Sequence, residues 1–288
     1  MTDTGERARD AAFLADWQQW RARREQALRQ PDGWLSLVGL LWLQAGRLCI
    51  GRDPGNHLPL PDGPAWLGEI EVDAQGRAQL HPHPQALGAA RVDGQAASAS
   101  VPLRADDDPQ PSQLEVGRLR LQLLRRGDAL ALRVRDPHAD ALRRFSGLAY
   151  FRADRQWRLA ARWESFAAPR VLHQQSSNGA ERTAPLHGCA HLELQGRHYR
   201  LLPFEQSDRH LLFAFADASN GTQTYAAGRF LHADPPRDGE LVLDFNRAIN
   251  PPCAFSDFAT CPLPPPENRL QAAVYAGELA YPNGTAHG

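Results

Sequence analysis

The sequence predicts a mainly β protein: an N-terminal helix, a small β-sandwich, and a barrel-like C-terminal β domain closed by a proline-rich loop. From residue 46 onward, short apolar runs with period-two alternation follow one another, separated by Gly, Asp and Pro. Residues 6–29 instead carry apolar side chains at helical spacing. These patterns predict a helical arm over residues 1–45, a sandwich over 46–140 and a C-terminal domain over 141–288.

The N-terminal helix is expected to bury an apolar face formed by Phe13, Trp17, Trp20 and Leu28. The sequence Pro-Asp-Gly at 31–33 is a stop signal for this helix. The apolar run 34–43 is predicted to be a short buried piece that docks the helix on the rest of the chain.

Several later segments carry strand signals. Alternating leucines on both sides of Arg126-Gly127-Asp128 predict a hairpin over residues 118–136. Asn220-Gly221, between two apolar runs, predicts a second hairpin turn. Residues 272–281 are expected to form the strand that closes the C-terminal domain, and residues 167–188 to be rich in loops. A further strand is predicted over 156–166, with one apolar face: Trp157, Leu159, Ala161 and Trp163.

Charge and composition exclude some functions. With 32 basic and 33 acidic residues the formal net charge is −1, which provides no electrostatic footprint for nucleic acid or an anionic membrane. The longest apolar run is about half of the roughly 20 residues that a membrane span needs. The start of the chain has no apolar segment typical of a secretion signal, and four cysteines in such a chain indicate a reduced, cytoplasmic protein. The oligomeric state stays open.

The segment 247–268 is an unusually long loop with many prolines. Prolines stiffen the backbone, and ordered loops longer than about 12–15 residues are usually functional. Asn250 and Asn268 bracket it, with side chains able to satisfy loop backbone groups. Cys253 and Cys261 have seven residues between them, which is not the spacing of a zinc or redox motif, so both are predicted to be small buried residues.

His187, Cys189 and His191 would lie on one face of an extended segment, where they could bind zinc. Chance histidines at a strand edge are the favoured interpretation, so we predict no metal site and no cofactor. The sequence also lacks the motifs of α/β-hydrolases, P-loop NTPases and Rossmann dehydrogenases.

The candidate site lies in the C-terminal domain. Tyr225 and Arg229 are expected on one face of a strand, and Asp244 on the polar face of the next strand. The loop 232–239 leaves their register open. If Arg229 meets Asp244, the two form either a structural ion pair or an anion-binding site.

We take the second alternative as the hypothesis. Arg229 would hold an anionic group, Asp244 would orient it or act as a base, and Tyr225 would donate a hydrogen bond. In an open pocket, removal of Tyr225 or Arg229 would be near neutral for stability. Further ligand-binding residues are predicted around this catalytic set: Asp217, Asn246, Asn250, Cys253 and Asn268.

These residues also carry a family resemblance. Between residues 215 and 278 the chain resembles a bacterial and archaeal family labelled domain of unknown function 1684. The segments "GWLSLVGLLWL" and "FSGLAYF" resemble its earlier landmarks, so the resemblance covers most of residues 12–281. The resemblance implies no activity, but it makes the proline-rich loop the hallmark of the family. The matching positions are Asp217, Gly221, Thr224-Tyr225, Gly228-Arg229, Asp244-Phe245-Asn246, Asn250 to Cys253 and Cys261 to Pro264.

Residues 46–136 resemble, more faintly, a forkhead-associated sandwich. "IGRDPGNHLPLPDGP" is similar to the Gly-Arg loop of that domain, whereas its phosphothreonine-gripping Ser-x-x-His is missing after Arg52. Two functions are therefore expected as alternatives. The first is a small-molecule site for an anionic ligand, which could also be an enzyme site. The second is a protein-interaction module in which the sandwich docks a partner and the C-terminal domain is a scaffold.

Overall fold

The computed structural model describes residues 3–177, 179 and 181–282. The chain divides into two compact units, one of residues 28–145 and one that joins residues 1–27 to residues 146–288. This division differs from the predicted helical arm, sandwich and C-terminal domain. The helix belongs with the C-terminal unit, and the apolar run that follows it belongs with the sandwich.

The unit of residues 28–145 contains two sheets. One has the strand order β1-β11-β10-β9-β6-β7 and the other the order β3-β2-β4-β5-β8. A short helix, α2 (Asp140–Arg144), follows them. The strands are β1 (Leu37–Leu43), β2 (Gly46–Gly51), β3 (Leu58–Pro59), β4 (Gly68–Val72), β5 (Ala78–Pro82), β6 (Ala90–Val92), β7 (Gln95–Ala96), β8 (Val101–Leu103), β9 (Gln113–Val116), β10 (Leu119–Arg126) and β11 (Ala129–Arg135).

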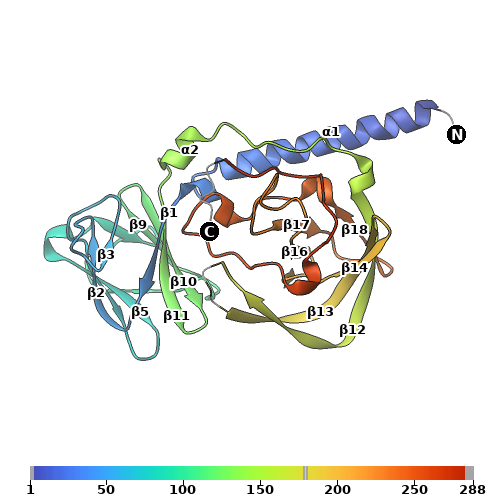
Figure 1. Cartoon of the computed structure of the whole chain (residues 1–288). Coiled ribbons are helices and arrows are strands. Elements are labelled where there is room, and N and C mark those ends of the chain that lie inside the picture. Colours follow the sequence, from blue (N-terminus) through green and yellow to red (C-terminus); the bar gives the residue numbers. More distant parts are fainter. Residues whose placement is uncertain (1–2, 178, 180, 283–288) are drawn as a thin grey trace. The chain divides into compact units, whose positions relative to one another are not determined.

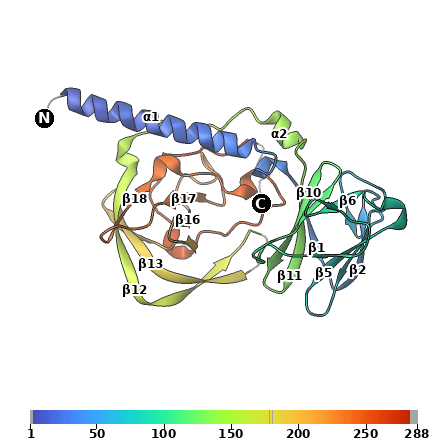
Figure 2. The same ribbon diagram turned by 180° about the vertical axis from the view of Figure 1, so that it is seen from behind.

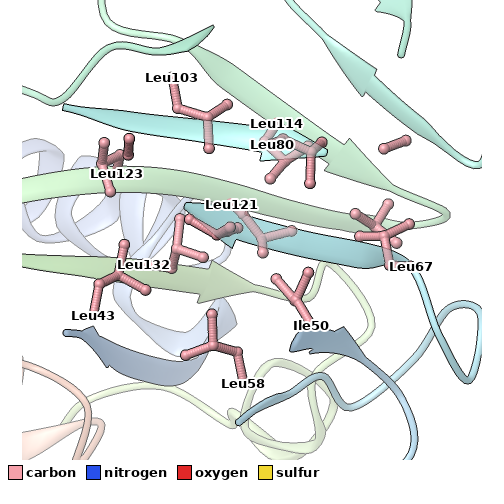
Figure 3. Packing of buried hydrophobic residues seen from close by; sticks show 14 of the residues in the cluster. Leu43, Ile50, Leu58, Leu67, Leu80, Leu103, Leu114, Leu121, Leu123 and Leu132 are labelled. Carbon is pink, nitrogen blue, oxygen red and sulfur yellow. The ribbon is translucent and has the colours of Figure 1, made fainter. Parts of the chain in front are cut away.

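The core of this unit is built from aliphatic side chains of both sheets (Figure 3). Leu121 and Leu132 of the β10–β11 hairpin are buried there, together with Ile50 and Leu80 from the other sheet. The predicted hairpin is confirmed, since β10 and β11 pair from Arg120↔Arg135 to Arg126↔Ala129.

The run 34–43 was predicted wrongly as a piece that docks the helix. It forms a single 3-10 turn, Trp34–Ser36, and then strand β1, which pairs with β11. Leu40 and Leu41 are consecutive in the strand, so their side chains lie on opposite faces of the sheet, and both are partly buried. With apolar residues on both faces, the sequence shows no alternation with a period of two that would predict a strand.

The other unit contains helix α1 (Asp3–Leu28) and two sheets, which leave the predicted barrel open. The strand orders are β14-β13-β12-β18 and β15-β16-β17. Figure 1 shows these strands with the irregular segment after β18 in orange to red, and Figure 2 shows them from behind. The strands are β12 (Arg158–Gln175), β13 (Glu181–Leu194), β14 (Arg197–Leu201), β15 (Glu205–Gln206), β16 (Leu211–Phe215), β17 (Arg229–Ala233) and β18 (Glu240–Asp244).

The alternation predicted for β12 and β18 is confirmed. Trp157, Ala161 and Trp163 are buried, as are Leu241 and Leu243 on the paired strand. These side chains join aromatic residues of β16 in one apolar core. The opposite face of β12 and β18 is more exposed and mostly polar, with Ala160 and Val242 as apolar exceptions.

The loop-rich passage predicted over 167–188 is instead a long ribbon in which β12 and β13 pair as far as Gln175↔Glu181. Most of the described side chains in its outer part are exposed. The buried positions include Leu172, Gln174 and Leu186, one of which is polar. With so few apolar residues on the covered face, the sequence shows no regular apolar alternation that could reveal the strands.

Two other predictions are wrong in detail. Residues 272–281 form no strand; their bonds to the rest of the unit include an isolated bridge, Glu278↔Tyr150, and single backbone hydrogen bonds such as that from the Leu279 amide to the Ala149 carbonyl. Strands β16 and β17 do pair, but residues 216–228 connect them, so Asn220-Gly221 lies inside a long loop and does not form a two-residue hairpin turn.

Helix α1 is attached to the C-terminal unit through polar contacts as well as apolar ones. Trp17 Nε1 donates to the Asn246 carbonyl at 3.1 Å, and Arg24 Nε lies 2.8 Å from the buried carboxylate of Glu278. Among the described helices, none has the length and apolar character needed to cross a membrane.

Candidate functional site

The structure places Arg229 in the core and not beside Asp244. Its side chain is completely buried and forms an ion pair of 2.7 Å with Asp217, which is also completely buried. The meeting of Arg229 and Asp244, which the sequence left open, does not occur. Arg229 lies at the start of β17, whereas Asp244 ends β18, and these strands belong to different sheets.

Backbone groups complete the surroundings of this ion pair. Arg229 donates to the carbonyls of Ala276 and Val274 at 2.5 and 3.0 Å, and Asp217 accepts from the Val274 amide at 3.1 Å. Burial lowers the pKa of Arg229, and Asp217 opposes that effect. Arg229 and Asp217 thus tie the irregular segment 272–278 to the sheet, and neither side chain is free to hold an anion.

Tyr225 precedes strand β17 and is buried in the loop before it. Its hydroxyl donates to the Cys253 carbonyl at 3.3 Å, and the Cys253 amide donates to Cys261 Sγ at 3.2 Å. Burial raises the pKa of Tyr225. Cys253 and Cys261 are buried free thiols, which confirms the prediction of small buried residues.

The two asparagines that bracket the loop serve the backbone. Asn268 is fully buried, and its amide group bonds both backbone groups of Leu202 and the carbonyl of Ala214. Asn250 Nδ2 donates to the Leu279 carbonyl at 2.8 Å, and the Asn250 amide donates to Glu278 at 2.7 Å. The proline-rich loop forms no strand, so the side chains of Asn250 and Asn268 supply hydrogen bonds to backbone groups that strand pairing would otherwise supply.

Asp244 is the predicted catalytic residue that lines an open cleft. Its Oδ1 accepts hydrogen bonds from the Asn246 amide at 3.1 Å and from Asn246 Nδ2 at 2.9 Å. Asn246 is itself buried and bonds both backbone groups of Asp154. Asn246 therefore positions Asp244, and its amide group is already engaged by Asp154 and Asp244.

The cleft beside Asp244 has a volume of about 240 Å³. That lies just below the ~300–1,000 Å³ typical of pockets for drug-sized ligands, so it suits a smaller molecule. It is lined by Trp20, Arg158, His210, His232, Ala233, Asp234, Val242, Asp244 and Arg247.

Arg158 lies directly opposite Asp244 in the antiparallel ladder of β12 and β18. Opposed residues in such a ladder have their Cβ atoms about 4.5–5.5 Å apart and share a face of the sheet. The exposed Arg158 side chain forms no ion pair or hydrogen bond with the described residues. Its place on the polar face of residues 156–166 was visible in the sequence, but the strand opposite it was not.

The other cation of the cleft, Arg247, is already engaged. It contacts Asp16 of α1, and its Nε lies 3.5 Å from Asp244 Oδ2. Two histidines also line the cleft: the rings of His210 and His232 lie 6.0 Å apart, and His210 Nε2 lies 3.0 Å from Glu205. Desolvation, and then the neighbouring His210, lower the pKa of His232.

A larger groove of about 610 Å³ lies between α1 and the segment 151–157. Its walls include Phe13, Leu14 and Tyr275. Arg155, at its rim, is paired with Asp10 at 3.0 Å. The groove therefore offers a mixed surface, in which aromatic side chains alternate with charged ones.

Fold and site together define a mainly β protein whose C-terminal unit carries a small cleft of mixed charge. Residues 143–279 match the model of the family described as "Protein of unknown function (DUF1684)", and over these residues the chain belongs to that family. The predicted resemblance is thus confirmed for the C-terminal part, while the landmark at residues 33–43 lies outside the match.

A solved structure is also similar to part of the chain. It is the solution NMR structure of an uncharacterized protein of Haloarcula marismortui, with 35% sequence identity over 47% of this chain and 77% of that protein, and a TM-score of 0.39. A search of curated proteins finds no match.

Proposed function

We propose that the C-terminal unit binds a small molecule through an anionic group, in the cleft formed around Arg158 and Asp244. The observation that carries this proposal is the guanidinium of Arg158, which has no ion pair with the described residues, at a cleft where Asp244, Arg247 and His210 all have charged or hydrogen-bonding partners. An unpaired guanidinium presents up to five N–H donors in a planar fork, which matches a carboxylate or phosphate.

The carboxylate of Asp244 narrows the ligand class. A ligand with only anionic groups would be repelled by Asp244, which Asn246 orients beside Arg158. A hydroxy or amino carboxylate places its anionic group on Arg158 and its donor on Asp244 Oδ2, the oxygen that Asn246 leaves free. In this arrangement Asp244 orients the ligand or accepts a proton from it, which is the step an enzyme would need.

We expect at least one small hydroxy or amino carboxylate to bind the full chain, and Arg158→Ala to weaken that binding about 10- to 100-fold, because a hydrogen bond to a charged group contributes about 1.5–3 kcal/mol. Isothermal titration calorimetry measures the affinity. The probes are paired carboxylates that differ only in the hydroxyl or amino group, with inorganic phosphate as a third class.

Arg209→Ala is the matched control, since Arg209 is an exposed neighbour of His210 that does not line the cleft. Equal affinities of the Arg158→Ala and Arg209→Ala variants would refute the site. If Asp244→Asn leaves the preference for the hydroxy or amino compound unchanged, the role of Asp244 is refuted and the anion site at Arg158 stands.

A second candidate function is partner binding through the sandwich of residues 28–145. Arg52 is exposed in the turn after β2, and its amide donates to the Pro64 carbonyl at 2.8 Å. That contact holds the turn beside residues 64–66, where Trp66 is 48% exposed. An exposed Arg and an exposed Trp at neighbouring positions are typical of interaction surfaces.

We expect a phosphothreonine peptide library to show no binding that depends on Arg52, because the Ser-x-x-His element of forkhead-associated domains is missing. The full chain and the Arg52→Ala variant are compared on the same array. A peptide whose binding is lost both in Arg52→Ala and on dephosphorylation would contradict this expectation and would favour the interaction function.

A further inference from the structure

Three side chains with metal-binding atoms meet on the ribbon of β12 and β13. They are Glu164 of β12 and Cys189 and His191 of β13, and their ligand atoms all lie within 4.8 Å of one another. Glu164 is the direct ladder partner of Cys189, and His191 follows Cys189 by two residues. Period two of the strand therefore places all three side chains on the same face.

The three atoms converge on one point and do not form a chain. His191 Nε2 lies 2.6 Å from Glu164 Oε2 and 3.4 Å from Cys189 Sγ, and that sulfur lies 3.7 Å from the same Glu164 oxygen. In a nucleophile–base–acid relay the imidazole uses its two nitrogens for the two neighbours. Here a single nitrogen faces both, which is the arrangement of ligands around a central ion.

The distances agree with those around a tetrahedral zinc ion. Zinc bonds of about 2.3 Å to sulfur and about 2.0–2.2 Å to nitrogen and oxygen put the ligand atoms roughly 3.4–3.6 Å apart. The two distances from Cys189 Sγ, 3.4 and 3.7 Å, already have this length. The distance between His191 Nε2 and Glu164 Oε2, now a hydrogen bond of 2.6 Å, would have to increase by roughly 0.8 Å to admit an ion with these bond lengths.

The burial of the cluster is one-sided. Cys189 is completely buried, while the side chains of Glu164 and His191 are 41% and 31% exposed. A bound ion would contact the Cys189 thiolate on its buried side and Glu164 and His191 on its exposed side, and its fourth coordination position would be open to solvent. Three protein ligands with one open position are typical of catalytic zinc sites.

We propose that Glu164, Cys189 and His191 bind one divalent transition-metal ion, with zinc the best match to the mixture of sulfur, nitrogen and oxygen ligands. The site shares no residue with the cleft at Arg158, and it goes beyond the proposed ligand-binding function. The proposed ligands differ from those considered in the sequence, His187, Cys189 and His191, because Glu164 takes the place of the exposed His187. The ladder of β12 and β13 is irregular between Ser165 and Arg170, the region opposite His187.

Cobalt titration of the full chain tests the site. We expect about one Co²⁺ per chain, with a thiolate-to-cobalt charge-transfer band in the near ultraviolet and visible bands typical of tetrahedral coordination, all removed by zinc. Loss of an outer-shell partner already weakens metal binding about 10- to 100-fold, so Glu164→Gln and His191→Gln should each weaken it by about 100-fold or more.

Cys189→Ser should abolish the charge-transfer band. His187→Gln is the matched control on the same strand, and Cys253→Ser is the control for another buried thiol; both should retain the band and the affinity. The partly exposed Glu164 and His191 variants keep the test valid if Cys189→Ser does not fold. The proposal is overturned if the band survives in Cys189→Ser, or if Glu164→Gln and His191→Gln bind cobalt as tightly as His187→Gln.

Discussion

Arg229→Ala is expected to lower the free energy of unfolding by about 3–5 kcal/mol, because removing one member of a buried ion pair leaves the other charge uncompensated. Asp217 is fully buried, and Arg229 is the cation that pairs with it at 2.7 Å. The carbonyls of Val274 and Ala276 lose their donors in the same variant. Such a loss is a large part of the ~5–15 kcal/mol that stabilises a typical protein.

Urea unfolding of four variants measures this effect: Arg229→Ala, Asp217→Ala, the double variant and Arg237→Ala. Arg237 is an exposed arginine in the loop after β17 and should change stability by less than about 0.5 kcal/mol. The double variant should lose less than the sum of the two single variants, since neither charge then remains alone. A near-neutral Arg229→Ala, the outcome expected for a pocket residue, would show that Arg229 is not structural.

Asn268→Ala is expected to cost about 3 kcal/mol or more. The substitution removes three buried hydrogen bonds, of 2.7, 2.9 and 2.7 Å, to the amide and carbonyl of Leu202 and the carbonyl of Ala214. A buried backbone group without a partner costs about 1–3 kcal/mol. Leu202 and Ala214 are both buried, so water does not replace the lost partner easily.

Glu267→Ala is the control for this position. Glu267 precedes Asn268 in the same 3-10 turn, but its side chain is 38% exposed and lies 3.7 Å from Arg200. Exposed pairs of this kind contribute about 0–1 kcal/mol. If the chemical unfolding curves of Asn268→Ala and Glu267→Ala coincide, the hydrogen bonds of Asn268 do not stabilise the loop as inferred.

These two predictions assign Arg229 and Asn268 the structural alternative that the sequence left open beside a ligand-binding role. A charged or amide side chain in a glycine- and proline-rich context is compatible with ligand binding and with backbone support. The sequence contains no signal that separates the two. Burial decides between them, because a fully buried Arg229 paired with Asp217 has no accessible surface for a ligand.

The polar cleft was predictable in part. The alternation of β12 and β18 placed Arg158 and Asp244 on the outward faces of their strands, as the structure confirms. Their proximity was not predictable, since the pairing register depends on which strands become neighbours in the sheet. The same limit applies to Glu164, which joins Cys189 and His191 only through the ladder of the β12–β13 ribbon.

By itself the sequence determined the helix at the N-terminus, the hairpin of β10 and β11, the buried cysteines of the proline-rich loop and the family of residues 143–279. These features depend on local periodicity, on turn residues and on a motif that is contiguous along the chain. Only the tertiary structure decided that Arg229 pairs with Asp217, that Arg158 faces Asp244 and that Glu164 completes a cluster with Cys189 and His191. Each of these pairs joins separate strands or loops, and their distances are set by strand neighbours and register, which no local pattern encodes.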